Sequence, residues 1–292
     1  PKLKSRRVFR ISEEFEMKIF SSAKVNLNLT INREVKEGLH TLSSLMVPIS
    51  LFDEIYIREI DSGNDIIEFT PQIVTEGDST IHKSLQLLRE VNKFNQYFHI
   101  IVNKQIPVEA GLGGGSSNAG SIIKFLSTTY DLELPDLSSI ARNIGSDVPF
   151  FIQGLSANVS GYGQRIDPVH LEEPMHLLIA TPHERLSTGK VFEEFDREQN
   201  HQDSDVVLHN DIEIKNNLLK AALKVEPKLL ERKEYLESIM GHEFFMSGSG
   251  TTFFCLGEEE HLNAKKQNID PEQFRLILVT KKIHCSLLQE AD

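Results

Sequence analysis

The stretch "IPVEAGLGGGSSNAGSI", residues 106–122, places five glycines and three serines between two apolar segments. Glycine allows backbone N–H groups to approach an anion closely, and the start of a helix favours negative charge. Apolar residues then recur at helical spacing: Ala119, Ile122, Ile123, Leu126 and Tyr130. This spacing predicts a helix from about Ser116, preceded by a strand at 97–107. The order strand, glycine loop, helix therefore predicts a phosphate-binding loop.

Two well-known phosphate-binding loops do not fit this stretch. A Walker A loop requires a lysine directly after its last glycine, and none follows here. A dinucleotide-binding fingerprint requires GxGxxG, whereas the run from Gly111 reaches Ser116 at the last position, after a lead-in that contains proline. A flexible linker is also excluded, because apolar residues lead into the loop and an amphipathic helix follows it.

Lys24 and Asn26 are candidate polar groups on one face of a strand. The segment "KVNLNLTI", residues 24–31, alternates strictly between polar and apolar residues, which predicts a half-buried strand. Both polar side chains point the same way and can reach into one cleft. A single lysine on a strand is more often a solvated charge, so the residues alone leave both interpretations open.

Asp147, in "GSDVPFF", is a candidate general base. A carboxylate at an exposed turn can accept the proton of a reacting hydroxyl. From the local sequence alone, an aspartate that caps the turn before Pro149 is the favoured interpretation.

The remaining chain predicts an α+β fold. Strands are expected at 51–60 and 274–280, helices at 81–91 and 134–144, a long helical segment at 218–240, and a second loop of small residues at 245–256. Helices and strands do not alternate as they do in a doubly wound sheet. A soft domain boundary is expected near residues 165–172, because the composition beyond it shifts to a polar, charge-rich stretch from about Glu193 to Glu213.

The composition limits the classes of partner. The 292 residues include 31 Lys and Arg against 43 Asp and Glu, a formal charge of -12, which argues against nucleic-acid binding. Cys255 and Cys285 have no zinc-site spacing, which favours a reducing compartment. No apolar run approaches the roughly 18 residues of a membrane span, so we expect a cytoplasmic location without membrane contact. Whether a targeting segment precedes Pro1 stays open, as does the oligomeric state.

Three segments together resemble the GHMP kinases, which include galactokinase, homoserine kinase and mevalonate kinase. The segment "KQIPVEAGLGGGSSNA" resembles their ATP-binding motif, and "SSAKVNLNLTI" and "FMSGSGTTFFCL" resemble their first and third motifs in the same order. The resemblance implies a two-domain fold. An N-terminal domain like domain 2 of ribosomal protein S5, residues 1–168, would bind ATP and carry catalysis. A ferredoxin-like C-terminal domain, residues 169–292, would bind the substrate.

The same resemblance implies roles for individual residues. Asp147 would be the catalytic base, and Lys24 would lie beside the reacting hydroxyl. The segment 246–254 would lie across the cleft from the ATP loop and close over the substrate phosphates. Mg²⁺ is expected with ATP, although no carboxylate cluster identifies its protein ligands. The residues implied in ATP binding are Lys104, Pro107, Gly111, Leu112, Gly113, Gly114, Gly115, Ser116 and Ser117.

The triple glycine, "SAKVNLNL", "GLHTLSSLM" and "GSDVPFFIQG" further resemble the GHMP kinases that act on 4-diphosphocytidyl-2-C-methyl-D-erythritol. This resemblance implies phosphorylation of the substrate's 2-hydroxyl in the non-mevalonate, or methylerythritol phosphate, route of isoprenoid biosynthesis. The residues implied around the cytidine are Asn26, His40, Thr188 and Phe192.

The sequence departs from this group at Leu39, where an aromatic residue is usual. That difference leaves open a GHMP kinase acting on another alcohol. A nucleotide-binding regulator that has lost catalysis is a third hypothesis, and the retention of both Lys24 and Asp147 counts against it.

Overall fold

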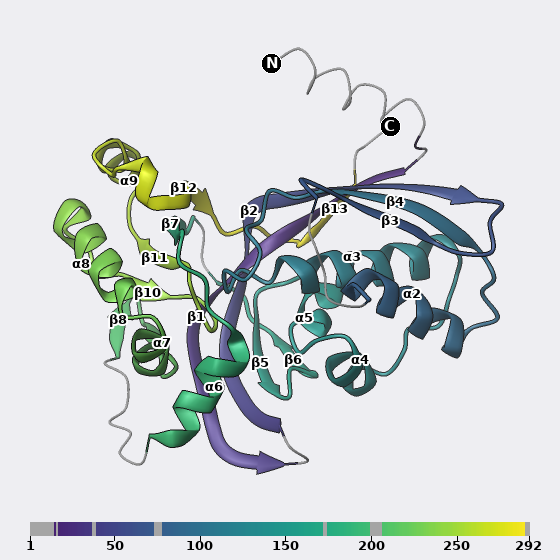
Figure 1. Ribbon diagram of the computed structural model, residues 1–292, viewed down its shortest axis with the longest axis horizontal. Coiled ribbons are helices and arrows are strands. Elements are labelled where there is room, and N and C mark those ends of the chain that lie inside the picture. The colour runs from purple at the N-terminus through teal and green to yellow at the C-terminus, as the bar shows by residue number, and fades with distance from the viewer. Residues whose placement is uncertain are drawn as a thin grey trace.

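The computed structural model describes residues 15, 17–36, 39–72, 78–171, 174–198 and 206–289, with the side chains of 34–39 and 288–289 excepted. These residues form two β-sheets with helices packed against them, and the expected α+β class is confirmed (Figure 1).

The larger sheet is built around one long antiparallel pair. Its main path runs β3-β4-β2-β1-β9-β8, with β13 beside β1, β5 beside β2, and β6 beside β5. Its strands are β1 (Met17–Lys36), β2 (Leu39–Ile60), β3 (Ile66–Thr70), β4 (Tyr97–Asn103), β5 (Ala157–Gly161), β6 (Arg165–Pro168), β8 (Val207–His209), β9 (Ile212–Asn216) and β13 (Leu287–Gln289).

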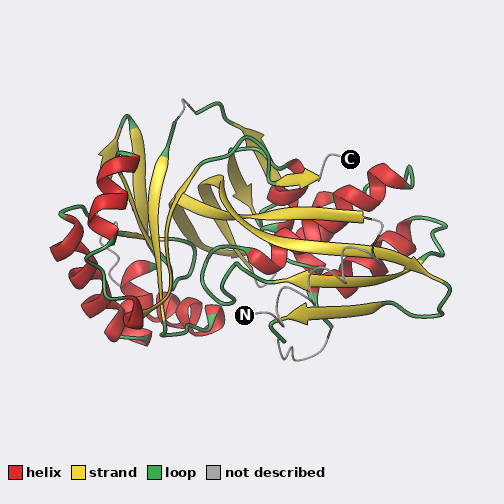
Figure 2. Cartoon of the chain, turned by 90° about the horizontal axis from the view of Figure 1, so that it is seen from above, coloured by secondary structure: helices red, strands yellow, loops and turns green. Residues whose placement is uncertain are grey.

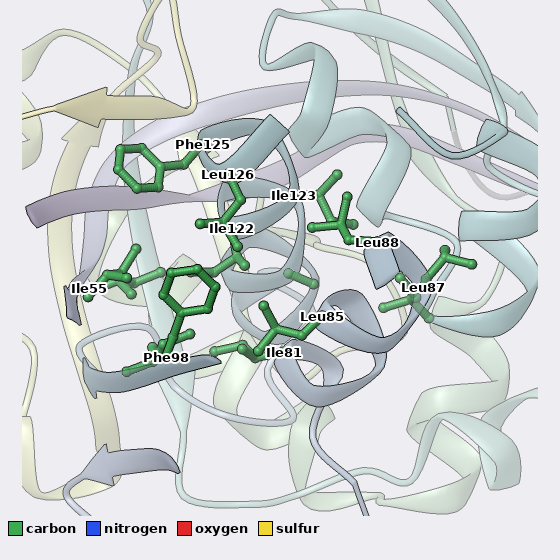
Figure 3. Close-up of a cluster of buried hydrophobic side chains, with 14 of the residues drawn as sticks. Ile55, Ile81, Leu85, Leu87, Leu88, Phe98, Ile122, Ile123, Phe125 and Leu126 are labelled. Carbon is green, nitrogen blue, oxygen red and sulfur yellow. The ribbon is translucent and has the colours of Figure 1, made fainter. Parts of the chain in front are cut away.

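Four helices cover one face of this sheet (Figures 1 and 2). They are α2 (Thr80–Val91), α3 (Gly114–Thr129), α4 (Leu137–Asn143) and α5 (Val148–Gln153). The apolar faces of α2 and α3 bury Leu88 and Ile122 against strand residues such as Ile55 and Phe98 (Figure 3). Burial of each such side chain contributes about 1.5–3 kcal/mol, so this core holds α2 and α3 against the sheet.

The smaller sheet has the order β10-β11-β7-β12. Its strands are β7 (His176–Pro182), β10 (Phe245–Met246), β11 (Phe253–Leu256) and β12 (Phe274–Lys281). The other elements of this half are α6 (Thr188–Arg197), α7 (Leu219–Val225), α8 (Lys228–Met240), α9 (Glu259–Lys266) and the 3₁₀ turn η1 (Pro271–Gln273). This sheet and its helices follow the ferredoxin-like order of elements, which is β7, then helices, then β10 and β11, then α9 and β12.

The structure corrects two details of the helices expected from the sequence. The long helical segment at 218–240 is two helices, because Pro227 lacks the N–H that a continuous helix needs and lies at the N-cap of α8. The turn expected at Ser146 and Asp147 leads directly into a further short helix, α5, with Pro149 in its first turn.

The strand that carries Lys24 and Asn26 is also more buried than expected. The Lys24 side chain is only 3% exposed and Asn26 is 2% exposed, although a half-buried strand was predicted. Its polar face is covered because it faces Gly113 and Asp147 instead of solvent.

The domain boundary at 168/169 stays a prediction. β6 ends at Pro168 and β7 begins at His176, yet β8, β9 and β13 come from beyond the boundary and join the larger sheet. Among the described helices, none combines the length and the apolar character needed to cross a bilayer.

Candidate active site

A cavity of about 440 Å³ lies where the glycine loop meets β1, the first turns of α2 and α6, and the loop between β10 and β11. The structure brings most of the predicted site residues to its wall: Lys24, Asn26, Lys104, Pro107, Gly111, Gly113, Gly114, Gly115, Ser116, Asp147, Thr188 and Phe192. Leu112 and Ser117 are buried behind the wall, and His40 packs against Phe192. These residues come from both halves of the chain.

The glycine loop opens the first turn of α3 toward the cavity. Gly113 is the N-cap of α3 with a left-handed φ of 72°, a conformation that favours glycine, and the helix begins at Gly114. The first N–H groups of a helix have no partner within it, and no acidic side chain lies in this first turn. Gly114, Gly115 and Ser116 line the cavity, so these N–H groups can bind an anion there.

The second glycine-rich loop is in direct contact with the first. Ser247 Oγ donates to the Gly111 carbonyl at 3.0 Å, and the Asn26 N–H donates to Ser247 Oγ at 3.2 Å. The Thr252 N–H donates to the Ala110 carbonyl at 3.1 Å. Gly248, Ser249 and Gly250 line the same cavity, so this loop forms the wall next to the predicted ATP loop.

Lys24 and Asp147 form an ion pair in the cavity wall. The distance between Lys24 Nζ and Asp147 Oδ2 is 3.3 Å, and the Asp147 side chain is 22% exposed. Asp147 occupies the N-cap position of α5 but accepts no capping hydrogen bond. A purely capping role for Asp147 is therefore not supported by its contacts, whereas a carboxylate beside an ammonium, open to the cavity, can receive a proton.

The Asn26 amide sets the orientation of Lys24. Its Oδ1 accepts from Lys24 Nζ, and its Nδ2 donates to Ser44 Oγ at 2.8 Å. Ser44 Oγ in turn donates to the Asn28 carbonyl at 2.5 Å. Asn26 therefore supports the ammonium from behind and leaves little of its own amide for a ligand.

Lys104 is held by residues that the sequence did not reveal. Its Nζ donates to the carboxylate of Asp53, on β2, and to Asn118 Oδ1 at 3.0 Å. Asp53 lies in "LFDEIYIREI", which carries several charged residues, and no pattern separates it from a solvated charge. Thr80 was also missed: it lines the cavity, and its Oγ1 donates to the Gly115 carbonyl at 2.8 Å.

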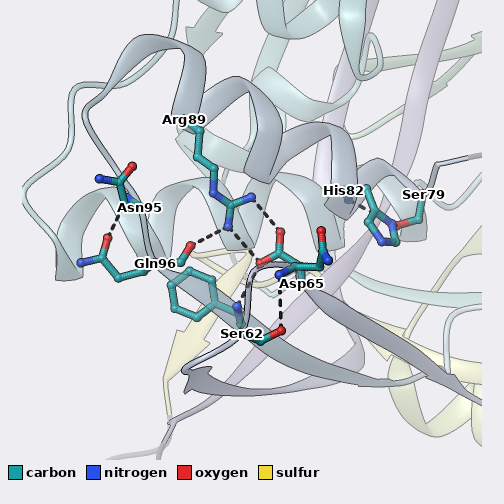
Figure 4. Close-up of polar contacts among 9 residues, drawn as sticks. Ser62, Asp65, Ser79, His82, Arg89, Asn95 and Gln96 are labelled. Carbon is teal, nitrogen blue, oxygen red and sulfur yellow. Dashed lines mark hydrogen bonds and ion pairs between the residues drawn. The ribbon is translucent and has the colours of Figure 1, made fainter.

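The first turn of α2, which carries Thr80, is fixed by local polar contacts (Figure 4). Ser79 is the N-cap, and its Oγ accepts from the His82 N–H at 3.3 Å. At the other end of the helix, Arg89 donates to both oxygens of Asp65 at 2.7 and 2.9 Å. A capping bond and a bidentate ion pair hold the two ends of this helix in place.

His40 and Phe192, two of the residues expected to bind the substrate, lie together. Their ring centroids are 5.6 Å apart with a 30° angle between planes. His40 Nδ1 is 2.8 Å from the Asn32 carbonyl, and Nε2 is 3.0 Å from Asp196 Oδ1. The Thr188 and Ser249 hydroxyls are hydrogen-bonded at 3.0 Å across the cavity mouth. Leu39 begins β2, and its side chain lies outside the described residues.

The two cations of the cavity wall already have anionic partners, Lys24 with Asp147 and Lys104 with Asp53. Across the described ranges, no three His, Cys, Asp or Glu side chains cluster closely enough to hold a metal ion.

Comparison with known proteins gives the family. The model of the GHMP kinase N-terminal domain matches residues 79–155, which include the glycine loop and Asp147. The 4-diphosphocytidyl-2-C-methyl-D-erythritol kinase of Fusobacterium nucleatum is 34% identical over 260 residues, covering 83% of this chain and 88% of that protein. The enzyme of that name from Deinococcus radiodurans is 30% identical over 251 residues, covering 82% and 84% of the two chains.

Solved structures of related kinases have the same fold as this chain. A crystal structure of 4-(cytidine 5'-diphospho)-2C-methyl-D-erythritol kinase superposes with a TM-score of 0.75 at 28% identity, covering 91% of this chain and all of the other. Homoserine kinase from Cytophaga hutchinsonii shares the fold, with a TM-score of 0.67 at 15% identity, over 94% of this chain and 96% of its own. The chain belongs to the GHMP kinase family, in the group of the 4-diphosphocytidyl-2-C-methyl-D-erythritol kinases.

Proposed function

We propose that this kinase transfers the γ-phosphate of ATP to the 2-hydroxyl of 4-diphosphocytidyl-2-C-methyl-D-erythritol, in the non-mevalonate route to isoprenoids. The observation that carries the proposal is the Lys24–Asp147 pair, 3.3 Å apart, in the same cavity wall as the glycine loop at the start of α3. A cytoplasmic location is part of the same proposal.

In the reaction, the substrate hydroxyl oxygen forms a bond to the γ-phosphorus while the bond from that phosphorus to the β,γ-bridging oxygen breaks. Asp147 accepts the hydroxyl proton, and ADP leaves. Lys24, held by Asn26, stabilises the charge that develops on the transferred phosphoryl group. The N–H groups at the start of α3 bind the nucleotide phosphates.

Mg²⁺ is expected to accompany ATP and to neutralise charge on its phosphates. The donors present fit a weakly held, nucleotide-borne ion: the Ser116 hydroxyl lines the cavity, and the described residues contain no dedicated cluster of carboxylates. The Ser116 oxygen would therefore complete a shell supplied mainly by phosphates and water.

The cytidine is proposed to lie near Phe192 and His40, beside the opening framed by Thr188. A base stacked on one aromatic ring gains about 1–3 kcal/mol. In this structure the two His40 nitrogens already face Asn32 and Asp196, so Phe192 is the group we expect to provide most of the contact.

The test is an ADP-release assay with ATP and a panel of alcohols that contains the diphosphocytidyl substrate, homoserine, mevalonate and galactose. We expect turnover with the diphosphocytidyl substrate and little with the others. Turnover with one of the other alcohols alone would establish the alternative of a GHMP kinase with a different acceptor.

The role of Asp147 is tested by Asp147→Asn. We expect kcat to fall by roughly 10²- to 10⁴-fold while the affinity for a non-hydrolysable ATP analogue changes by less than about threefold. Asp136→Asn is a matched control, because Asp136 does cap its helix, accepting from the Ser139 N–H at 3.0 Å. Turnover of Asp147→Asn within about threefold of wild type would remove Asp147 as the base.

A further inference from the structure

Asp53 is a fully buried carboxylate directly behind the ATP loop. Its side chain is 0% exposed and lies on β2, which runs beside β4 (Figure 1). Burying a carboxylate costs several kcal/mol unless charge partners and hydrogen bonds compensate for the lost hydration. The partners of Asp53 therefore show what this position is built to hold.

Both carboxylate oxygens of Asp53 are occupied: one accepts from the backbone that leads into the loop, and the other accepts from the side chains of Lys104 and Asn118. Oδ1 accepts the backbone N–H groups of Gln105 at 2.7 Å and Ile106 at 2.9 Å, just before Pro107 begins the loop. Oδ2 accepts from Asn118 Nδ2 at 2.9 Å and from Lys104 Nζ. One side chain thus joins the residues between β4 and Pro107, which lead into the loop, to the second turn of α3.

The consequence for Lys104 is a fixed ammonium at the cavity wall. Two of its three N–H bonds point to Asp53 and Asn118 Oδ1. The ammonium lies close to the loop backbone, since a Cβ added to Gly114 would be only 3.1 Å from Lys104 Nζ. Lys104 and Gly114 both line the cavity. The remaining N–H is therefore available beside the N–H groups expected to bind phosphate.

We infer that Asp53 is the positioning residue of the nucleotide site: it acts through Lys104, holding that ammonium beside Gly114 so that it binds ATP. This inference rests on the proposed function, in that it concerns the ATP side of the same cavity. Asp53 is fully buried and does not line the cavity, so it would act on the nucleotide only through Lys104.

The direct test is Asp53→Asn. The amide keeps an acceptor for Gln105 and Ile106, but its NH₂ group now faces two donors, Lys104 Nζ and Asn118 Nδ2. Displacing the ammonium should raise the KM for ATP and the dissociation constant of a non-hydrolysable ATP analogue by about tenfold or more, with kcat at saturating ATP within about threefold.

Asp65→Asn is the matched control for loss of a structural carboxylate. Asp65 is also largely buried, accepts both Arg89 nitrogens, and accepts the Phe98 N–H at 2.9 Å, but it lies outside the cavity wall. Both variants should lower the melting temperature, and only Asp53→Asn should weaken nucleotide binding. Equal nucleotide affinity in the two variants would overturn the inference and leave Asp53 with a structural role.

A double-mutant cycle shows whether Asp53 acts through Lys104. Lys104→Met should weaken analogue binding about as much as Asp53→Asn, and the double variant should be no weaker than either single variant by more than about threefold. The double variant buries no unpaired lysine, so it also serves if Asp53→Asn alone does not fold. A further tenfold loss in the double variant, or normal binding in Lys104→Met, would overturn the inference.

The two proposals fail in different ways. The wild-type protein could bind the analogue, and bind it more tightly than Asp53→Asn and Lys104→Met do, yet phosphorylate none of the alcohols. That result would refute the proposed substrate and support the role of Asp53. Wild-type protein that binds no ATP analogue would overturn both.

Discussion

Replacing Gly111 with alanine should separate the two glycine-rich loops and destabilise the protein. Gly111 has a φ of 73°, and an added Cβ would lie 2.1 Å from the Ser247 carbonyl oxygen, 3.0 Å from its carbon and 3.1 Å from the Gly250 oxygen. Carbon and oxygen atoms that are not bonded stay more than about 3 Å apart, so the loops must move by about 1 Å.

The cost can be estimated from three contributions. A side chain in the left-handed region costs about 1–2 kcal/mol. Separation also weakens the hydrogen bonds from Ser247 to Gly111 and from Thr252 to Ala110, each contributing about 1 kcal/mol. The sum is about 3–4 kcal/mol, a large part of the roughly 5–15 kcal/mol by which proteins of this kind are stable.

Gly115→Ala is the matched control. The nearest atom to its added Cβ is Thr80 Oγ1 at 3.7 Å, an ordinary contact, and Gly115 lies in the first turn of α3. We expect unchanged stability or a gain of about 0.5–1 kcal/mol, because alanine favours helix over glycine. Urea unfolding of the two variants and wild type, followed by circular dichroism, measures the difference. A Gly111→Ala cost below about 1 kcal/mol at equal m-value would refute the contact between the loops.

Three further outcomes are expected. Phe192→Ala should raise the KM for the diphosphocytidyl substrate by about five- to tenfold and leave the KM for ATP unchanged. If the variant and the wild type had the same KM for the diphosphocytidyl substrate, the cytosine ring would have to bind elsewhere. Burial, together with the nearby His261, Lys265 and His209, lowers the pKa of His242 below its ordinary value of 6.5. Below pH 6.5 the unfolded chain therefore binds more protons at this residue than the folded protein does, so stability falls as the pH drops. His242→Gln should reduce this acid loss, measured as urea midpoints at about pH 7.5 and about pH 5.5, and an unchanged difference would contradict it. Burial raises the pKa of Cys255 to about 12, so a thiol reagent at about pH 8 should label Cys255 only after unfolding, as mass spectrometry of the labelled peptides would show.

The parts of the site that a local pattern defines were predictable from sequence. The glycine run, the helix after it and the alternating strand with Lys24 each carry a periodicity or composition that specifies their structure. The resemblance to GHMP kinases then placed Lys24 and Asp147 at one site, which the 3.3 Å contact between them supports. Local sequence alone favoured a capping role for Asp147, because it contains no information about a lysine more than a hundred residues away.

The supporting contacts were not predictable for the same reason. Asp53 has four partners, three from the residues that follow β4 and lead into the loop and one from α3, and none is its neighbour in sequence. Ser247 was recognised as part of a small-residue loop, but its contact with Gly111 depends on how the two sheets are placed. The division of 218–240 into α7 and α8 was, in contrast, readable from Pro227 and was missed because the apolar spacing continues across it.

The pairing of β13 with β1 has a consequence for biosynthesis. One segment of β1, residues 19–21, pairs with a strand on each side. Its partner on one side is β2, which is synthesised soon after β1, and its partner on the other side is β13, which is synthesised only after both glycine-rich loops. While the ribosome is still translating the intervening residues, this edge of β1 has open N–H and C=O groups that another nascent chain can pair with. The larger sheet therefore stays incomplete along this edge until Leu287–Gln289 have left the ribosome, and this late strand then shields the edge of an early one.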